Sequence, residues 1–195
     1  MSKLKIHYNA PVILTFTIIA FIALTLGYIS NGRTTSGFFI LFPAFSLQPL
    51  NLLRMFTYVL GHADFNHFFG NFSIILLIGP LIEEKHGSKK LIIMILLTTL
   101  ISAIIHVIFF NTAILGASGI VFMLILLTPF TNTQSGKIPL TFILIALIYI
   151  GREVFLGFIV DDNISRFGHI LGGIMGAFIG YFMNKGQNSD ITIVN

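Results

Sequence analysis

The sequence predicts an all-α membrane protein, a bundle of six transmembrane helices with a long membrane-associated loop between the first two. Three observations lead to this fold class. Of the 195 residues, 55% are hydrophobic and only 9% are charged, whereas soluble domains average about 25% charged residues. The mean hydropathy is +0.95. Charge-free apolar stretches, most of them about as long as a membrane-spanning helix, recur along the chain.

This composition excludes several classes of protein. The chain has too few polar side chains to cover a globule in water, which excludes a soluble enzyme, a disordered protein and a nucleic-acid binder. The net charge of +4 comes from lysines that flank the apolar stretches and does not indicate a basic patch. The sequence contains no cysteine, which removes disulfides, thiolate metal sites and cysteine nucleophiles.

The first four spans follow from uncharged apolar runs. Residues 10–29 have the length of a spanning helix, and no small-residue cleavage motif follows them, so they do not form a signal peptide. Residues 65–82 form the next such run. Residues 91–136 contain no Asp, Glu, Lys or Arg. That length accommodates two spans with a turn at residues 111–116, where polar and glycine residues interrupt the run.

The last two spans are bounded by charges. The fifth is extended to about Phe158, which places Arg152 and Glu153 near an interface. The sixth begins near Arg166 and ends near Met183. We therefore expect a single domain, residues 1–195, with spans at about 10–29, 65–82, 90–110, 117–130, 138–158 and 166–183, and a short polar tail, 186–195.

The positions of lysine and arginine indicate the orientation. With the N-terminus inside, seven lysines lie on the inner side: Lys3, Lys5, Lys85, Lys89, Lys90, Lys137 and Lys185. Four arginines lie on the outer side: Arg33, Arg54, Arg152 and Arg166. Both termini are then cytoplasmic.

The first loop, residues 30–64, is far too long for a turn. It is also apolar and aromatic, most of all over residues 38–45, unlike a loop exposed to water. Two interpretations remain open: a short helix pair lying partly in the outer leaflet, and an interfacial anchor.

Polar and ionisable groups inside a span are costly, so each is a candidate functional residue. His67 and Asn71 fall in the first two turns of the second span, on one side of the helix. Ser118 opens the fourth span, and His169 lies near the start of the sixth. Three helices therefore place these side chains at a similar depth near the outer surface. The other candidates are His62 and His106.

Small residues predict that the fourth and sixth spans lie in contact, because they allow two backbones to approach closely. The sixth span has a glycine at every fourth position, and the fourth span begins with two more. This contact would bring His169 within reach of the Ser118 hydroxyl. The packing glycines are Gly116, Gly119, Gly168, Gly172, Gly176 and Gly180.

These residue types indicate acyl-transfer chemistry. A serine hydroxyl becomes a good nucleophile when a neighbouring imidazole removes its proton. The tetrahedral oxyanion then needs donors, which the Ser118 backbone N–H, the Asn71 amide and the His67 ring would supply. Since the fourth and sixth spans contain no Asp or Glu to orient His169, a Ser-His dyad is the better interpretation than a triad.

Each of these residues also has a simpler structural interpretation. Ser118 alone would be read as a packing residue or helix cap. His106 is expected to line the cavity, and His62 either to support the loop or to form a hydrogen bond near the site. The sequence lacks an HExxH string, and the spacing of His62 and His67 puts them on different helical faces, so neither a metal nor another cofactor is expected.

Taken together, the motifs resemble those of the rhomboid intramembrane serine proteases, in their six-helix bacterial form. Residues 116–119 resemble the family's GxSG, with Ser118 as nucleophile. Residues 168–176 resemble its AHxxGxxxG, with His169 as base and Gly168 in place of the usual alanine. Residues 62–71 resemble its HxxxxHxxxN, which supplies the oxyanion hole.

The resemblance covers about residues 54–180 and includes two further features. The long loop with Arg54 resembles the family's membrane-dipping loop, and residues 79–87 resemble its inner turn after the second helix. Two positions depart from the family: Leu53 stands where tryptophan is common, and Phe122 stands where tyrosine packs on the catalytic histidine. Phenylalanine can still stack on an imidazole.

The resemblance implies a protease of the bacterial cytoplasmic membrane whose active site opens to the outer face through a water-filled cavity. Its partners would be the lipid bilayer and transmembrane protein substrates, which would enter between the second and fifth spans. One alternative is a catalytically inactive relative that binds transmembrane clients. A small transporter is another, but the chain shows no internal repeat, and its polar residues gather near one face.

Overall fold

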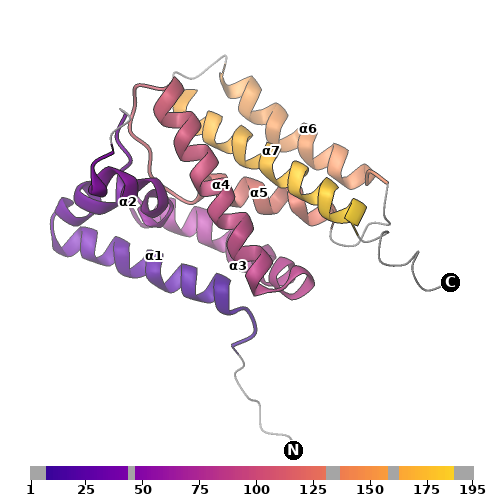
Figure 1. Cartoon of the computed structure of the whole chain (residues 1–195), viewed down its shortest axis with the longest axis horizontal. Helices are drawn as coiled ribbons and strands as arrows, with labels where there is room; N and C mark the ends of the chain where they lie inside the picture. Colours follow the sequence, from indigo (N-terminus) through magenta and orange to yellow (C-terminus); the bar gives the residue numbers. More distant parts are fainter. Residues whose placement is uncertain (1–7, 44–46, 131–136, 158–162, 187–195) are drawn as a thin grey trace, which may run out of the picture.

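The computed structural model describes residues 8–43, 47–130, 137–157 and 163–186, which form seven α-helices and three short helical turns (Figure 1). The long elements are α1 (Pro11–Ile29), α3 (Phe65–His86), α4 (Ser88–Phe109), α5 (Ser118–Leu127), α6 (Leu140–Gly157) and α7 (Asn163–Gly186). The first loop contains a π-helical turn, η1 (Thr35–Phe39), helix α2 (Pro49–Thr57) and a 3-10 turn, η2 (Tyr58–Leu60). A further 3-10 turn, η3 (Thr128–Phe130), follows α5.

Three of the described helices, α1, α3 and α4, are long and apolar enough to cross a membrane by length and composition. Helices α5, α6 and α7 contain shorter apolar runs within the described residues. These runs are Ser118–Phe130, Leu140–Gly151 and Gly168–Phe182. Residues 187–195 of the expected polar tail, and the side chains of Arg152 and Glu153, lie outside what the structure describes. The architecture is therefore all-α in the described part of the chain.

One boundary differs from the sequence prediction. We placed the end of the second span at residue 82 and an inner turn from residue 79, but α3 continues to His86. The reversal into α4 occurs at Gly87, whose φ of +82° favours glycine. The charged residues after Ile82 mark where the apolar run ends, whereas the helix itself ends at the glycine.

Glu83 joins the end of α3 to the start of α1. Its carboxylate is only 3% exposed and accepts hydrogen bonds from the backbone N–H groups of Val12 (3.0 Å) and Ile13 (3.1 Å). The Ser88 hydroxyl donates to the same carboxylate at 2.6 Å. The first N–H groups of a helix have no partner within the helix, so Glu83 caps α1 from a distant part of the sequence.

Replacing Glu83 with alanine should lower the free energy of unfolding by about 1–3 kcal/mol, because buried N–H groups of α1 lose their acceptor. Unfolding of the purified protein by sodium dodecyl sulfate, in mixed micelles, measures this change. Glu84→Ala is the matched control, because the Glu84 side chain is exposed. Equal effects of the two substitutions would contradict the capping role.

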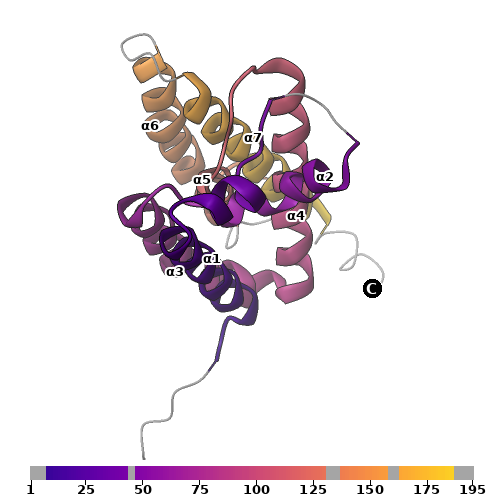
Figure 2. The same ribbon diagram turned by 90° about the vertical axis from the view of Figure 1, so that its left-hand side faces the viewer.

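Helix α5 lies at the centre of the bundle, with α4, α6 and α7 around it (Figures 1 and 2). Every residue from Ile120 to Leu127 is buried. Helix α7 meets α5 backbone to backbone, because a Cβ at Gly172 or Gly176 would overlap the carbonyl oxygen of Gly119 or Met123, respectively. This is the helix pair that the glycine spacing predicted.

The two ends of the glycine row differ from that prediction. A Cβ at Gly168 would meet no atom within 4 Å, and one at Gly180 would meet only the side chain of Phe130. The α5 backbone therefore comes closest to the row at Gly172 and Gly176, and near Gly168 it leaves room for a side chain.

Arg54, on α2, links this helix to the η1 turn earlier in the first loop. Its guanidinium donates to the carbonyl oxygens of Gly37 (2.9 Å) and Ser36 (3.2 Å), and to Asn51 Oδ1 (2.9 Å). It also lies over the Phe42 ring, 5.0 Å from the centroid. Figure 2 shows α2 beside α4, so the loop packs onto the helical bundle.

Candidate active site

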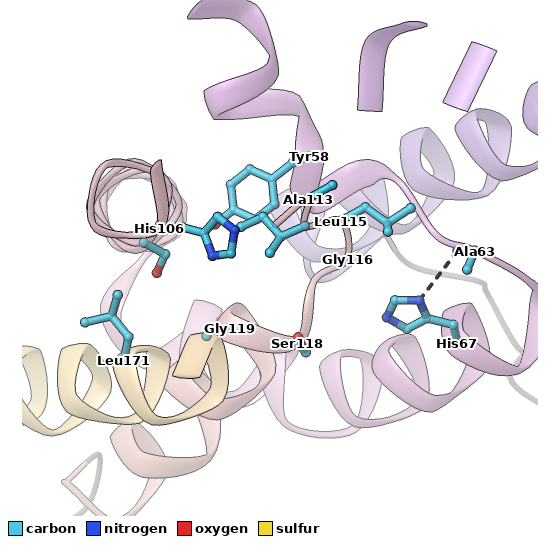
Figure 3. Close-up of a pocket in the computed structure, with 13 residues that line it drawn as sticks. Tyr58, Ala63, His67, His106, Ala113, Leu115, Gly116, Ser118, Gly119 and Leu171 are labelled. Atoms are coloured by element: carbon cyan, nitrogen blue, oxygen red, sulfur yellow. Dashed lines mark hydrogen bonds between the residues drawn. The ribbon is translucent and has the colours of Figure 1, made fainter. Parts of the chain in front are cut away.

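A cavity of about 340 Å³ opens where α3, α4, α5 and α7 meet (Figure 3). Figure 3 shows Ser118 between His67 and Gly119, with Tyr58 and His106 across the cavity. The lining residues are Tyr58, Ala63, His67, Ser102, His106, Ala113, Ile114, Leu115, Gly116, Ser118, Gly119, Gly168 and Leu171.

The segment that leads into Ser118 is held at three points. Ile114 pairs with Leu41 of the first loop through two backbone hydrogen bonds of 3.0 Å. The Gly116 N–H donates to the Tyr58 carbonyl at 2.9 Å, and His106 Nε2 donates to the Thr112 carbonyl at 2.8 Å. These bonds set where the chain enters α5.

Gly116 must be glycine for two reasons. Its φ is +117°, a conformation that side chains disfavour. A Cβ there would also lie 2.7 Å from Cε1 and Nε2 of the His67 ring. The missing side chain therefore allows the His67 imidazole to lie against the residues just before Ser118.

Ser118 is the first residue of α5 and is half-buried. Its backbone N–H lies at a helix N-terminus, where the amides have no partner in the helix and the dipole is positive. His67 is positioned by the first turn of α3, where its own N–H donates to the capping Asp64 carboxylate at 2.8 Å. The Ala63 N–H lies 3.5 Å from His67 Nδ1 (Figure 3), which leaves Nε2 facing Gly116.

His169 stacks on Phe122 with ring centroids 4.5 Å apart and an interplanar angle of 6°. The stacking expected of phenylalanine at this position is therefore present. Tyr149 of α6 contacts the Phe122 ring edge to face at 5.9 Å. His169 is not itself among the residues that line the cavity, but Gly168 beside it is.

Asn71 lies beneath the cavity rather than in its wall. Its side chain is only 7% exposed, and Nδ2 would lie 3.7 Å from a Cβ at Gly116. The same Nδ2 is hydrogen-bonded to His62 Nε2 at 3.1 Å. His62 Nδ1 in turn lies 3.3 Å from the Leu60 carbonyl oxygen.

His62 and His67 do not lie on different faces of one helix, which corrects the prediction from their spacing. His62 precedes α3 in the loop before its cap, and the two rings lie 4.8 Å apart, edge to face. A helical spacing rule does not apply to a residue outside the helix.

Two of the polar side chains that line the cavity, those of Tyr58 and Ser102, were not identified from the sequence. Ser102 lies on α4, one turn before His106, and Tyr58 lies at the end of the first loop. A sequence signal existed for the first, because Thr98, Ser102 and His106 recur every four residues in an otherwise apolar helix. Tyr58 had no such signal.

Comparison with known proteins identifies the family. The family model of the Rhomboid domain matches residues 49–186. The chain belongs to the rhomboid family. With its apolar helices, this membership makes the chain an integral membrane protein.

A curated relative is similar to this rhomboid. It is Rhomboid-related protein 1 from Caenorhabditis elegans, 28% identical over 168 residues. The aligned region covers 79% of this chain and 45% of the relative. This rhomboid therefore spans less than half the length of the relative it matches.

A pH dependence of stability follows from His62. Burial, and to a smaller extent the adjacent His67, lower the pKa of His62 to about 4, against the opposing effects of the Leu60 carbonyl and Asp64. An unfolded histidine titrates near pH 6.5. Between these two pH values the unfolded chain binds a proton that the folded chain does not, so the free energy of unfolding should decrease as the pH falls from about 6.5 to about 4.

Unfolding in detergent across this pH range, compared between the wild type and His62→Gln, isolates this contribution because the other histidines are common to both. The difference between the two proteins should shrink as the pH falls towards 4. A constant difference over the whole range would contradict the assignment.

Proposed function

We propose that this rhomboid is an intramembrane serine endopeptidase that hydrolyses peptide bonds in or near transmembrane segments of other proteins. The Ser118 hydroxyl attacks the scissile carbonyl carbon while His169 accepts its proton. His169 then delivers the proton to the leaving amine, and water hydrolyses the acyl-enzyme. The Ser118 backbone N–H, His67 and Asn71 are the proposed donors to the oxyanion.

The observation that supports this proposal most strongly is the position of His169 relative to α5. Phe122 follows Ser118 by one helical turn, and residues four apart share a helix face. The His169 ring stacks on Phe122, while Gly172 brings the α7 backbone against Gly119. An imidazole placed beside the first turn of α5 is suited to remove the Ser118 proton.

The membrane arrangement is also part of the proposal. All six long helices would span the bilayer, with both termini cytoplasmic and the cavity opening to the outer face of a bacterial cytoplasmic membrane. The substrate would enter between α3 and α6. A helix hides its carbonyl groups in hydrogen bonds, so the substrate must unwind locally, which favours helix-destabilising residues near the cleavage site.

Cleavage of a transmembrane reporter by the purified chain in liposomes tests this function. We expect two products cut within or close to the reporter's apolar segment, at equal rates with and without a chelator, because the proposed chemistry requires no metal ion. A folded chain that binds the reporter in the bilayer without cutting it would instead establish the client-binding alternative.

A further inference from the structure

We propose that His62 is a positioning residue that holds the Asn71 carboxamide with its NH2 group, rather than its oxygen, toward the nucleophile. This inference rests on the proposed function, because it assigns His62, the first histidine of the HxxxxHxxxN segment, a role in shaping the oxyanion site. His62 itself is not among the residues that line the cavity, and it reaches the cavity only through its contacts with His67 and Asn71.

The hydrogen-bond partners determine the tautomer of His62. The Leu60 carbonyl oxygen can only accept, so Nδ1, 3.3 Å away, must carry the proton. In a neutral ring Nε2 is then an acceptor. The group bonded to it at 3.1 Å must be a donor, and this group is the Asn71 NH2.

Burial makes this arrangement rigid. The His62 side chain is only 2% exposed, and its ring contacts the rings of Phe68 and Phe72 at 5.5 Å and that of His67 at 4.8 Å. A buried ring packed on three sides cannot easily reorient. The lowered pKa of His62 keeps the acceptor nitrogen free of a proton at neutral pH.

The orientation of Asn71 matters because its two ends differ in chemistry. The NH2 group lies next to Gly116, and so close to the approach to Ser118. One N–H bonds to His62, and the other remains to donate to an oxyanion. If the carboxamide turned over, its oxygen would face the developing negative charge and oppose it.

The first test observes the carboxamide directly. Protein with ¹⁵N-labelled asparagine should show one set of Asn71 NH2 resonances in the wild type and in His62→Gln, whose side-chain oxygen can still accept. His62→Leu, which fills similar space without an acceptor, should show a second or exchange-broadened set. Unchanged Asn71 resonances in His62→Leu would overturn the proposal.

The second test measures the protonation of the His62 ring in the wild type, so it does not depend on whether a variant folds. In ¹⁵N-histidine-labelled protein at pH 7, His62 should carry its proton on Nδ1 and none on Nε2. A proton on Nε2 would overturn the proposal, because that nitrogen could not then accept from Asn71.

The kinetic test is a double-mutant cycle with Asn71. His62→Leu should lower kcat for reporter cleavage by about 10-fold to 100-fold with little change in KM, comparable to weakening one oxyanion donor. His62→Gln should restore most of the loss. In the Asn71→Ala background His62→Leu should have almost no further effect, whereas equal losses in both backgrounds would contradict positioning through Asn71.

The experiments distinguish failure of the endopeptidase proposal from failure of the proposed role of His62. A wild-type chain without peptidase activity would refute the endopeptidase proposal, while the resonances of Asn71 and His62 would still decide whether His62 holds the carboxamide.

Discussion

Ser118→Ala should lower kcat/KM for a transmembrane reporter by about 10³-fold or more, because the variant retains the cavity but has no oxygen to form the acyl-enzyme. His169→Ala should cause a similar loss, and the double variant should be little worse than either single one. When two residues take part in the same proton transfer, the effects of their substitutions on the rate are strongly non-additive. Initial rates in liposomes measure all three variants.

Ser102→Ala is the matched control for this prediction. Ser102 lines the same cavity from α4, so its removal changes the polarity of the cavity without removing the proposed nucleophile. We expect Ser102→Ala to keep activity within about tenfold of the wild type. If Ser102→Ala lost as much activity as Ser118→Ala, the assignment of Ser118 as the nucleophile would be contradicted.

Gly172→Ala is expected to reduce both stability and activity. A Cβ at this position would overlap the Gly119 carbonyl oxygen, and backbone, unlike a side chain, cannot rotate away. Overpacking of this kind costs about 1–3 kcal/mol and occasionally more. Because the separation of α5 and α7 sets the distance between Ser118 and His169, a displacement near 1 Å should lower kcat by about 10²-fold.

Gly168→Ala provides the control on the same helix, one turn earlier. A Cβ at Gly168 would meet nothing within 4 Å, and replacing a helical glycine with alanine favours the helix by about 1 kcal/mol. Gly168→Ala should therefore be as stable as the wild type or more so, and active. Equal damage from the two substitutions would show that close contact at Gly172 is not the cause.

Much of the site could be anticipated because its signals are local in sequence. The glycine row of α7 and the small residues that open α5 identified the close helix pair. The expected stacking of Phe122 on His169 is likewise present. Periodicity and residue size are sufficient for such features, since each depends on one face of one helix.

Contacts made by loops across long separations could not be anticipated. The bond between His62 and Asn71 depends on the course of the chain before α3, and the Glu83 cap joins residues 70 positions apart. The continuation of α3 to His86 could not be anticipated either, because charge marks the end of an apolar run and not the end of a helix. Tyr58 reaches the cavity through the fold of the first loop.

The central claim is that Ser118 and His169 act as a nucleophile and its base. Labelling with a serine-directed fluorophosphonate probe, mapped by mass spectrometry on folded protein, tests this claim most directly. We expect a single labelled residue, Ser118, in the wild type and a large loss of labelling rate in His169→Ala. Labelling of a different serine, or labelling of Ser118 at an unchanged rate without His169, would contradict it.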